Sequence, residues 1–403
     1  MRITVVSEFV PTPENRGGIS ALLYSLLFFR PKDIEIKLYS FNFNNIESEE
    51  ITFIASKLNA KIVILPIPKK YNNRANSIWY SRYNKYLRNK PLTPFLFENS
   101  FLNDLERDSS DFIFLYHGQM VHLAYLLPNK RFLYSPPDCL PFNRFRRLGN
   151  PYRLGKVKMM LDDFIMLYKA NKSERNWGKS NLRVHFVGMG DYKFYKDVYG
   201  HDNAHFLLHP FVKYKEKDID FSHKKLKVII PGGYDMYYNT DVDKMLPALI
   251  ANKEKLQETF EFTFLGKKWS PIDERLKAAG FKAEFKTWVE DYAEELVQYD
   301  IEITPISFGT GTKGKVLDAM VNGLLVIGSD YALENICVRD MDSCVRYRDA
   351  SHIASILISV ANHREKYQRI AEKGRSQVMK YHDPTRISKR FFDIYYRELC
   401  GNK

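Results

Sequence analysis

One segment of the chain, residues 305–329, has the residue types that hold a nucleotide diphosphate. It begins with Pro305, which directly follows the predicted β-strand Ile301–Thr304. Gly309 and Gly311 come next, and glycine lets a backbone turn tightly and approach a ligand without a Cβ clash. The spacing is not that of a P-loop, because Gly-x4-Gly-Lys-Ser/Thr is absent. A glycine loop after a strand therefore predicts a place where a ligand meets the backbone.

A helix is predicted to begin near Lys313, directly after this loop. The first turn of a helix offers N–H groups and a positive dipole end, which favour a phosphate. Lys313 and Lys315 add positive charge there, and Asp318 supplies carboxylate oxygens suited to a ribose diol. The segment thus predicts a diphosphate cradle. An ordinary strand–helix turn with solvated lysines is the alternative that these residues leave open.

Short β-rich runs alternate with helical stretches through both halves of the chain. In the first half, the runs predict the strands Ile3–Ser7, Ile34–Tyr39, Ile62–Leu65, Phe112–Tyr116, Arg131–Ser135, Val184–Val187 and His205–Leu208. In the second half, they predict Lys227–Ile230, Glu261–Leu265, Ala283–Lys286, Ile301–Thr304, Leu324–Ile327 and Val345–Tyr347. Continuous apolar strands separated by helices indicate parallel sheets covered on both faces. We predict an α/β protein with two Rossmann-like, doubly wound domains facing a cleft.

The helices and domain limits follow from the same pattern. Predicted helices include Ile19–Phe29, Asp291–Tyr299, Gly314–Asn322, Ser351–Asn362, Glu365–Tyr381 and Pro384–Leu399. The charged stretch 213–227 lacks apolar periodicity and is interpreted as a linker or domain edge. We therefore predict domains over 1–212 and 213–383, with the last helix, 384–403, packing back on the first domain.

Three motifs of the second half resemble one enzyme family. Gly309-Thr-Gly-Thr-Lys-Gly-Lys-Val-Leu-Asp-Ala-Met, followed by Asn322-Gly, resembles the donor-site signature of retaining GT-B glycosyltransferases of family 4, within group 1. Pro231-Gly-Gly-Tyr-Asp-Met-Tyr-Tyr-Asn239 and Trp288-Val-Glu-Asp-Tyr resemble two further elements of that family. The resemblance covers about 228–335 and implies a GT-B fold, with the nucleotide sugar bound by the C-terminal domain and the acceptor by the N-terminal domain.

The resemblance also implies roles for individual residues. Asp318 corresponds to the family's ribose-binding glutamate, and Lys313 or Lys315 would neutralise the diphosphate, with Lys315 acting in catalysis. Trp288 would lie against the base. The loop bordering the sugar consists of Gly309, Thr310, Gly311 and Thr312. The chain has Thr310 where the family has its first glutamate, and the shorter Asp318 in place of the second.

The N-terminal half contributes candidates of its own. Gly17 and Gly18 follow the first strand, where the family brings a Gly-Gly loop to the donor; a plain turn capped by Ser20 is the alternative. His117 ends the strand Phe112–Tyr116 and resembles a family histidine that points into the cleft, although a structural histidine fits the same position. Asp138 follows another strand and could meet an acceptor.

Two basic, aromatic patches lie in the same half. Residues 69–90 hold seven Lys/Arg and no acidic residue, and 130–179 hold twelve against four, within a chain of net charge +13. Such composition suits an anionic membrane surface and a lipid-linked acceptor. It also fits a solvated basic face or, as a rival class, nucleic-acid binding or a DNA-modifying glycosyltransferase. No nucleic-acid-binding motif accompanies the patches, so nucleic acid is the less favoured partner.

The remaining expectations concern metals, location and activity. The sequence has no Asp-x-Asp at the end of a predicted strand, so it predicts no metal site there. The four cysteines lack the spacing of zinc ligands. No apolar run reaches the roughly 20 residues of a membrane span. We expect a cytoplasmic enzyme, in part peripheral on the inner membrane face, that needs no cofactor and acts in polysaccharide or glycoconjugate biosynthesis. The replacements at Thr310 and Asp318 leave an inactive GT-B binding protein as a further alternative.

Overall fold

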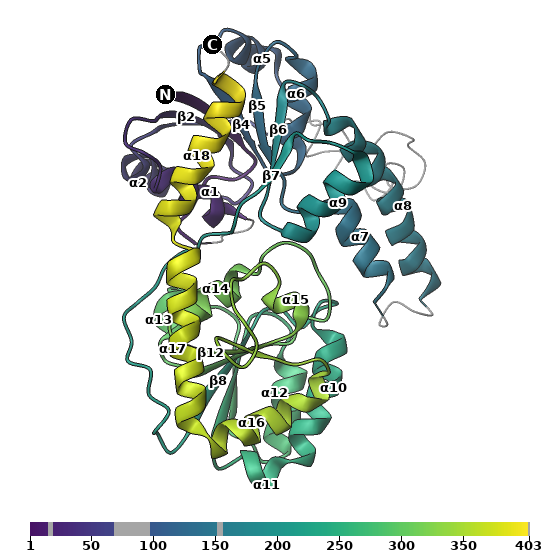
Figure 1. Ribbon diagram of the computed structural model, residues 1–403, viewed down its shortest axis with the longest axis vertical. Coiled ribbons are helices and arrows are strands. Elements are labelled where there is room, and N and C mark those ends of the chain that lie inside the picture. Colours follow the sequence, from purple (N-terminus) through teal and green to yellow (C-terminus); the bar gives the residue numbers. More distant parts are fainter. Residues whose placement is uncertain (15–18, 68–96, 151–155, 402–403) are drawn as a thin grey trace. The chain divides into compact units, whose positions relative to one another are not determined.

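The chain divides into two compact units. The computed structural model describes residues 1–14, 19–67, 97–150 and 156–401 (Figure 1). The first unit spans residues 1–148, 156–212 and 384–403, and the second spans 213–383. The second unit thus takes up the chain again at Lys213, and the last helix belongs to the first unit. Gly149 and Asn150 differ from the prediction, because their contacts place them with the second unit.

The first unit is built on a seven-stranded parallel sheet in the order β3-β2-β1-β4-β5-β6-β7. Its strands are β1 Arg2–Ser7, β2 Glu35–Phe41, β3 Lys61–Leu65, β4 Phe112–Tyr116, β5 Phe132–Ser135, β6 Leu182–Phe186 and β7 Ala204–Phe206. Its helices are α1 Ser20–Phe28, α2 Ser48–Leu58, α5 Asn99–Glu106, α6 Leu123–Leu126, α7 Leu140–Leu148, α8 Val157–Glu174, α9 Met189–Tyr199 and α18 Pro384–Cys400. Each predicted strand of this half is present within two residues at either end.

Both faces of this sheet are buried, which explains the unbroken apolar strands. On one face, Phe112 and Phe114 of β4 pack in a core with α1, α2 and α18. On the other face, Ile113 and Leu115 pack in a core with α5, α6 and α9. Successive side chains of a strand point to opposite faces of the sheet. When helices cover both faces, nearly every side chain of the strand is buried, so nearly every position is apolar. Helices α1 and α18 lie side by side, although they are at opposite ends of the sequence (Figure 1).

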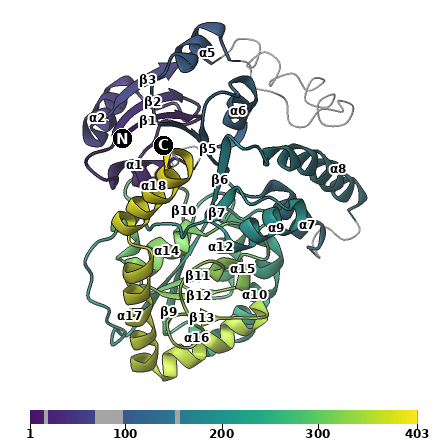
Figure 2. The same ribbon diagram turned by 45° about the horizontal axis from the view of Figure 1, so that its top comes forward.

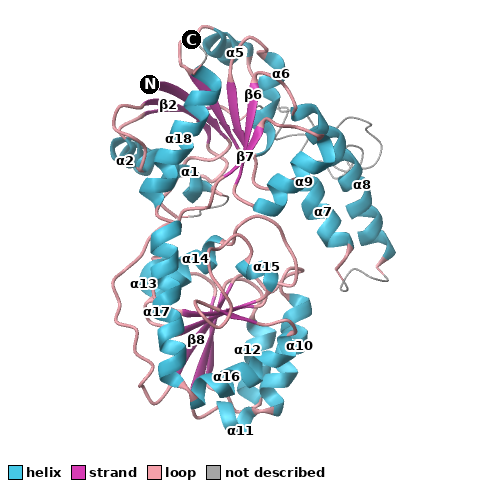
Figure 3. Cartoon of the chain, viewed as in Figure 1, coloured by secondary structure: helices cyan, strands magenta, loops and turns pink. Residues whose placement is uncertain are grey.

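The second unit repeats the design with six parallel strands in the order β10-β9-β8-β11-β12-β13. The strands are β8 Leu226–Pro231, β9 Phe260–Leu265, β10 Ala283–Lys286, β11 Ile301–Thr304, β12 Leu325–Gly328 and β13 Val345–Arg346. The helices are α10 Asn239–Ala251, α11 Lys253–Leu256, α12 Ser270–Ala278, α13 Tyr292–Leu296, α14 Gly314–Val321, α15 Asp330–Leu333, α16 Ile353–Asn362 and α17 Arg364–Tyr381. Within each unit, helices flank the strands (Figure 3).

Helix α13 is shorter than the sequence predicted. The prediction began it at Asp291, but Asp291 is the N-cap, and its carboxylate accepts hydrogen bonds from the Ala293 and Glu294 backbone N–H groups. The helix ends after Leu296, before the predicted end at Tyr299. Asp291 thus lies outside the helix and supplies acceptors to the N–H groups of its first turn.

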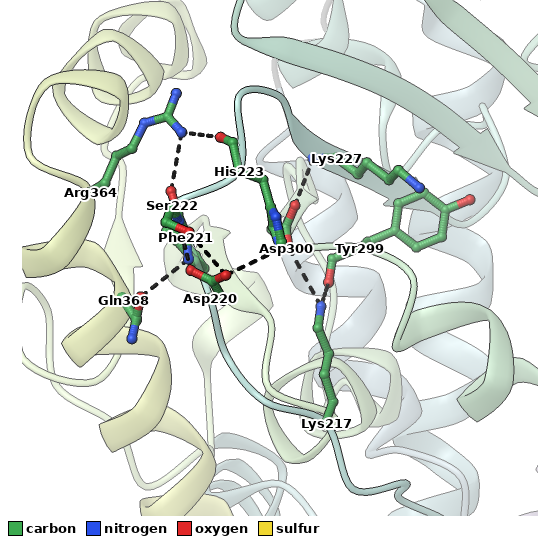
Figure 4. A network of polar contacts seen from close by, with 10 residues as sticks. All are labelled: Lys217, Asp220, Phe221, Ser222, His223, Lys227, Tyr299, Asp300, Arg364 and Gln368. Carbon is green, nitrogen blue, oxygen red and sulfur yellow. Dashed lines mark hydrogen bonds and ion pairs between the residues drawn. The ribbon is translucent and has the colours of Figure 1, made fainter.

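The charged stretch 213–225 is bound to the second unit over much of its length. The Lys217 ammonium donates to the Tyr299 carbonyl and lies 3.5 Å from the Asp300 carboxylate (Figure 4). Asp300 also accepts a 2.8 Å hydrogen bond from the Lys227 N–H at the start of β8. The Gln368 side chain accepts from the Phe221 N–H, and Arg364 donates to the Phe221 carbonyl. This part of the predicted linker is therefore a strap held by α17 and by the amino end of β11.

Asp300→Ala should destabilise the second unit. The Asp300 carboxylate is buried, and its loss leaves the Lys227 N–H without its acceptor and the Lys217 ammonium without its ion-pair partner. We expect a loss of roughly 2–4 kcal/mol in the free energy of unfolding, measured by urea titration. Asp220→Ala is the control, because among the described residues that carboxylate bonds to its neighbours Ser222 and His223 and its side chain is 46% exposed. Equal losses in the two variants would contradict the structural role of Asp300.

Candidate donor site in the second unit

Two of the predicted motifs meet at the carboxyl edge of the second sheet. Strands β8 and β11 are parallel neighbours, so the loops that follow them emerge side by side. The Ser307 N–H and hydroxyl both donate to the Tyr237 carbonyl, at 2.8 and 2.9 Å. The rings of Tyr237 and Phe308 lie 4.7 Å apart. The loop after β8 and the donor-site loop after β11 therefore form one joined structure.

Two glycines, one in the loop after β8 and one in the loop after β9, allow these loops to pack closely. Gly232 has φ +133°, and Gly266 at the end of β9 has φ +134°. A Cβ on Gly266 would lie 1.8 Å from the Gly232 carbonyl oxygen, which no side chain can tolerate. The same oxygen accepts a 2.8 Å hydrogen bond from the buried Trp269 indole. Glycine is required here so that the loops after β8 and β9 can touch.

The donor-site loop is closed by its own lysine. Gly309 and Gly311 have positive φ values of 147° and 67°, as the sequence predicted for a tight turn. The Lys313 ammonium donates to the carbonyls of Thr310 and Gly311, at 2.5 and 3.2 Å. Asn335 donates a further hydrogen bond to the Gly311 carbonyl, at 3.3 Å. Lys313 is thus a structural part of the loop, and it occupies the N-cap position of α14.

Lys315 differs from Lys313 in its bonding. Among the described residues, its ammonium makes no hydrogen bond or ion pair, and its side chain keeps contact with solvent. The surrounding protein lowers the pKa of Lys315, while the negative charges of Glu302, Asp235 and Asp318 oppose that change. A lysine held among carboxylates but bonded to none of them is available to an anion. Asp318 lies one turn further along α14 and is half-buried.

Glu302 is a buried acid that the sequence reasoning missed. Its side chain lies in β11 with 0% exposure, and Oε1 accepts a 2.6 Å hydrogen bond from the Thr304 hydroxyl. Within the described structure, Oε2 has no hydrogen-bond partner, nor does the buried hydroxyl of Tyr292 on α13. Burial raises the pKa of Glu302 to about 8. The signal was available: one acid interrupts the otherwise apolar strand Ile-Glu-Ile-Thr.

His117, in the first unit, is held by a second missed acid. Its Nδ1 lies 2.8 Å from the Glu8 carboxylate, which also accepts a hydrogen bond from the Gln119 N–H. A carboxylate only accepts, so Nδ1 carries the hydrogen and Nε2 is left to interact elsewhere. His117 has φ +74°, a costly backbone conformation for a non-glycine residue. Because β1 and β4 are neighbours, Glu8 and His117 end adjacent strands.

The other predicted residues have simpler positions. Asp138 lies half-buried between β5 and α7. Trp288 is 72% exposed on the segment between β10 and α13. Gly17 and Gly18 fall outside the described residues, as does the basic patch 69–90. Thr310 is buried in the donor-site loop, with 6% exposure, and Thr312 is half-buried.

The described part of the chain has no candidate membrane-spanning helix and no candidate metal cluster. None of its helices combines the length and apolarity needed to cross a bilayer. Over the same residues, no group of three or more His, Cys, Asp or Glu side chains is arranged to hold a metal ion.

Part of the second unit is similar to a known family. Residues 226–363 match the family described as glycosyl transferases group 1. These residues contain the β8 and β11 loops and helix α14. No curated protein matches the sequence in a direct comparison.

Solved structures share the fold over nearly the whole chain at low identity. HepE of Anabaena, in complex with UDP and glucose, has a TM-score of 0.64 at 9% identity, covering 97% of this chain and 98% of that chain. Sucrose-phosphate synthase of Thermosynechococcus elongatus has a TM-score of 0.66 at 11% identity, with both chains fully covered. WaaG, a glycosyltransferase involved in lipopolysaccharide biosynthesis, has a TM-score of 0.61 at 13% identity, covering 98% and 99%.

The fold and the family match together define the class of protein. The two doubly wound parallel sheets are those of the GT-B fold, as the sequence predicted. Residues 226–363 match the group 1 glycosyltransferase family, and this match together with the fold supports a glycosyltransferase as the class of enzyme.

Proposed function

We propose that this glycosyltransferase takes a sugar from a nucleotide-diphosphate donor and binds that donor at the loops after β8 and β11. The observation that carries the proposal is the contrast between the two lysines. Lys313 closes the donor-site loop, whereas Lys315 presents an ammonium that no described residue bonds. In this proposal, Lys315 stabilises the charge that develops on the leaving diphosphate, and Asp318 accepts hydrogen bonds from the ribose hydroxyls.

Uridine diphosphate is the nucleotide we propose. The solved structures of HepE, which share this fold, are complexes with UDP, with UDP and glucose, and with UDP-glucose. Trp288, exposed beside the N-cap of α13, would lie against the base. No metal is required in this proposal, because Lys315 and the N-terminus of α14 supply the positive field.

The acceptor is proposed to be a glycan or a lipid-linked sugar in bacterial-type surface polysaccharide or glycoconjugate assembly. WaaG, with the same fold, is involved in lipopolysaccharide biosynthesis. On the first unit, His117 is oriented by Glu8 so that Nε2 can contact a substrate hydroxyl. Asp138 and the Gly17-Gly18 loop are further proposed contacts. Transfer with retention of configuration and a cytoplasmic location, partly peripheral on the membrane, complete the proposal.

Two other functions make different predictions. A DNA-modifying or nucleic-acid-binding protein would bind DNA with a steep dependence on salt. An inactive GT-B protein would bind the nucleotide without turning over the sugar donor, and the replacements at Thr310 and Asp318 motivate that alternative.

Thermal stabilisation by UDP, GDP and ADP tests the proposed donor site. At a UDP concentration 100 times its Kd, the apparent free energy of unfolding should rise by ~2.7 kcal/mol. Asp318→Ala should reduce the shift, because the ribose loses its acceptor, while Glu254→Ala, an exposed carboxylate on α11, should leave it unchanged. If none of the three nucleotides stabilises the wild type, the proposed site is wrong.

A further inference from the structure

Helix α8 of the first unit exposes an apolar and aromatic face. Four large side chains on it are exposed, at 76% for Val157, 55% for Leu161, 63% for Phe164 and 58% for Tyr168. Their spacing of four, three and four residues places them on one face of the helix, over successive turns. Scattered exposed apolar residues are normal, but a continuous stripe of this size marks a contact surface.

The positive and negative side chains of α8 differ in their exposure. Its exposed charged residues are the lysines Lys158 and Lys172. Its carboxylates are turned inward: Asp163 and Glu174 are buried, with 2% exposure each, and Asp162 is half-buried. The exposed side chains of α8 are therefore apolar, aromatic or positively charged.

Helix α7 supports the face and extends it. The helices α7 and α8 lie side by side in both views (Figures 1 and 2). Arg144 and Arg147 of α7 lie 3.1 and 3.3 Å from the buried Asp163 carboxylate, which joins the two helices by ion pairs. Phe145, between these arginines in sequence, is 60% exposed. The ion pairs hold the hairpin together while its apolar side chains stay in water.

We propose that the exposed face of α8, together with Phe145 of α7, docks on the surface of an anionic lipid bilayer. A bilayer interface takes apolar and aromatic side chains into its headgroup and acyl boundary, and its negative potential attracts lysines beside them. A second copy of the chain would bring the same lysines together, which opposes self-association through this face. The proposal is independent of the donor site, since no residue of that site belongs to α7 or α8.

Co-sedimentation of the full chain with phosphatidylcholine vesicles, with and without phosphatidylglycerol, tests this surface. The wild type should bind the anionic vesicles, and Leu161→Glu with Phe164→Glu should lower the partition coefficient by about tenfold or more. Phe53→Glu is the matched control, because Phe53 is 59% exposed on α2 and should tolerate the same change. Lys158→Glu with Lys172→Glu should remove the preference for phosphatidylglycerol.

Each outcome decides the proposal. Weak binding by the α8 variant, with normal far-UV circular dichroism and an unchanged UDP-induced shift, supports it and excludes misfolding as the cause. The proposal is overturned if the wild type does not bind anionic vesicles, or if the α8 variant binds them as strongly as the wild type. A wild type that is dimeric by light scattering, becomes monomeric in the α8 variant and does not bind vesicles would assign the face to a second copy instead.

Discussion

Replacing Lys315 with alanine should weaken UDP binding about 10- to 100-fold and leave the free energy of unfolding almost unchanged. The reason is that the Lys315 ammonium bonds to no described protein group, so its removal breaks no hydrogen bond or ion pair among the described residues. Hydrogen bonds to charged groups contribute about 1.5–3 kcal/mol, which corresponds to that loss of affinity. Isothermal titration with UDP and urea unfolding measure the two quantities. Lys315→Arg keeps the charge and should retain most of the affinity.

Lys313→Ala is the informative comparison, because it changes the same residue type two positions away. The Lys313 ammonium holds the carbonyls of Thr310 and Gly311, so its loss should destabilise the loop by roughly 1–2 kcal/mol. UDP binding should weaken less than in Lys315→Ala. If Lys313→Ala has the larger effect on affinity and no effect on stability, the two roles are reversed. Lys253→Ala, an exposed lysine of α11, controls for loss of charge alone.

Glu302 should make both the stability of the protein and its affinity for UDP depend on pH. Burial raises the pKa of Glu302 to about 8 in the folded chain, above its ordinary value of 4.5. A raised pKa in the folded state means that folding favours the protonated form. The stabilisation is therefore complete below about pH 4.5 and is lost as pH rises toward 8, by at most about 1.4 kcal/mol per pH unit.

The same ionisation should act on the donor site. Above pH 8, Glu302 becomes a buried anion near Lys315. Its negative charge offsets the positive potential of the lysine and repels the diphosphate. UDP affinity should then fall as pH rises through 8. In Glu302→Gln the group cannot ionise, so affinity should stay level and stability should fall less with pH. Lys315→Arg should keep the pH dependence, which separates Glu302 from titration of the lysine itself.

The measurement is urea unfolding and UDP titration at pH 6 and about pH 9, for the wild type and Glu302→Gln. The difference between the two proteins matters, because burial also raises the pKa of Glu174 in the first unit to about 8. Glu258→Gln, an exposed carboxylate of the second unit, should behave as the wild type. Parallel pH profiles for wild type and Glu302→Gln would show that the carboxyl of Glu302 does not control either property.

The fold was predictable because its local signals agree with one another. Apolar runs bounded by turn residues gave each strand of both sheets, since parallel strands buried on two faces need a continuous apolar sequence. The glycines of the donor-site loop were predictable for a similar reason, because Gly309 and Gly311 adopt backbone conformations that few other residues tolerate.

What only the tertiary structure decided is which polar groups meet. Lys313 and Lys315 look equivalent in sequence, yet Lys313 bonds to the loop and Lys315 bonds to no described residue. The reason is that Lys313 is the N-cap of α14, with an extended backbone, whereas Lys315 lies in the first turn of the helix. Glu8 and His117 are 109 residues apart and meet because β1 and β4 are neighbours in the sheet. Residue spacing thus determined the elements and the glycine loop. The partners of each charge depended on strand order and helix rotation, which the local sequence does not encode.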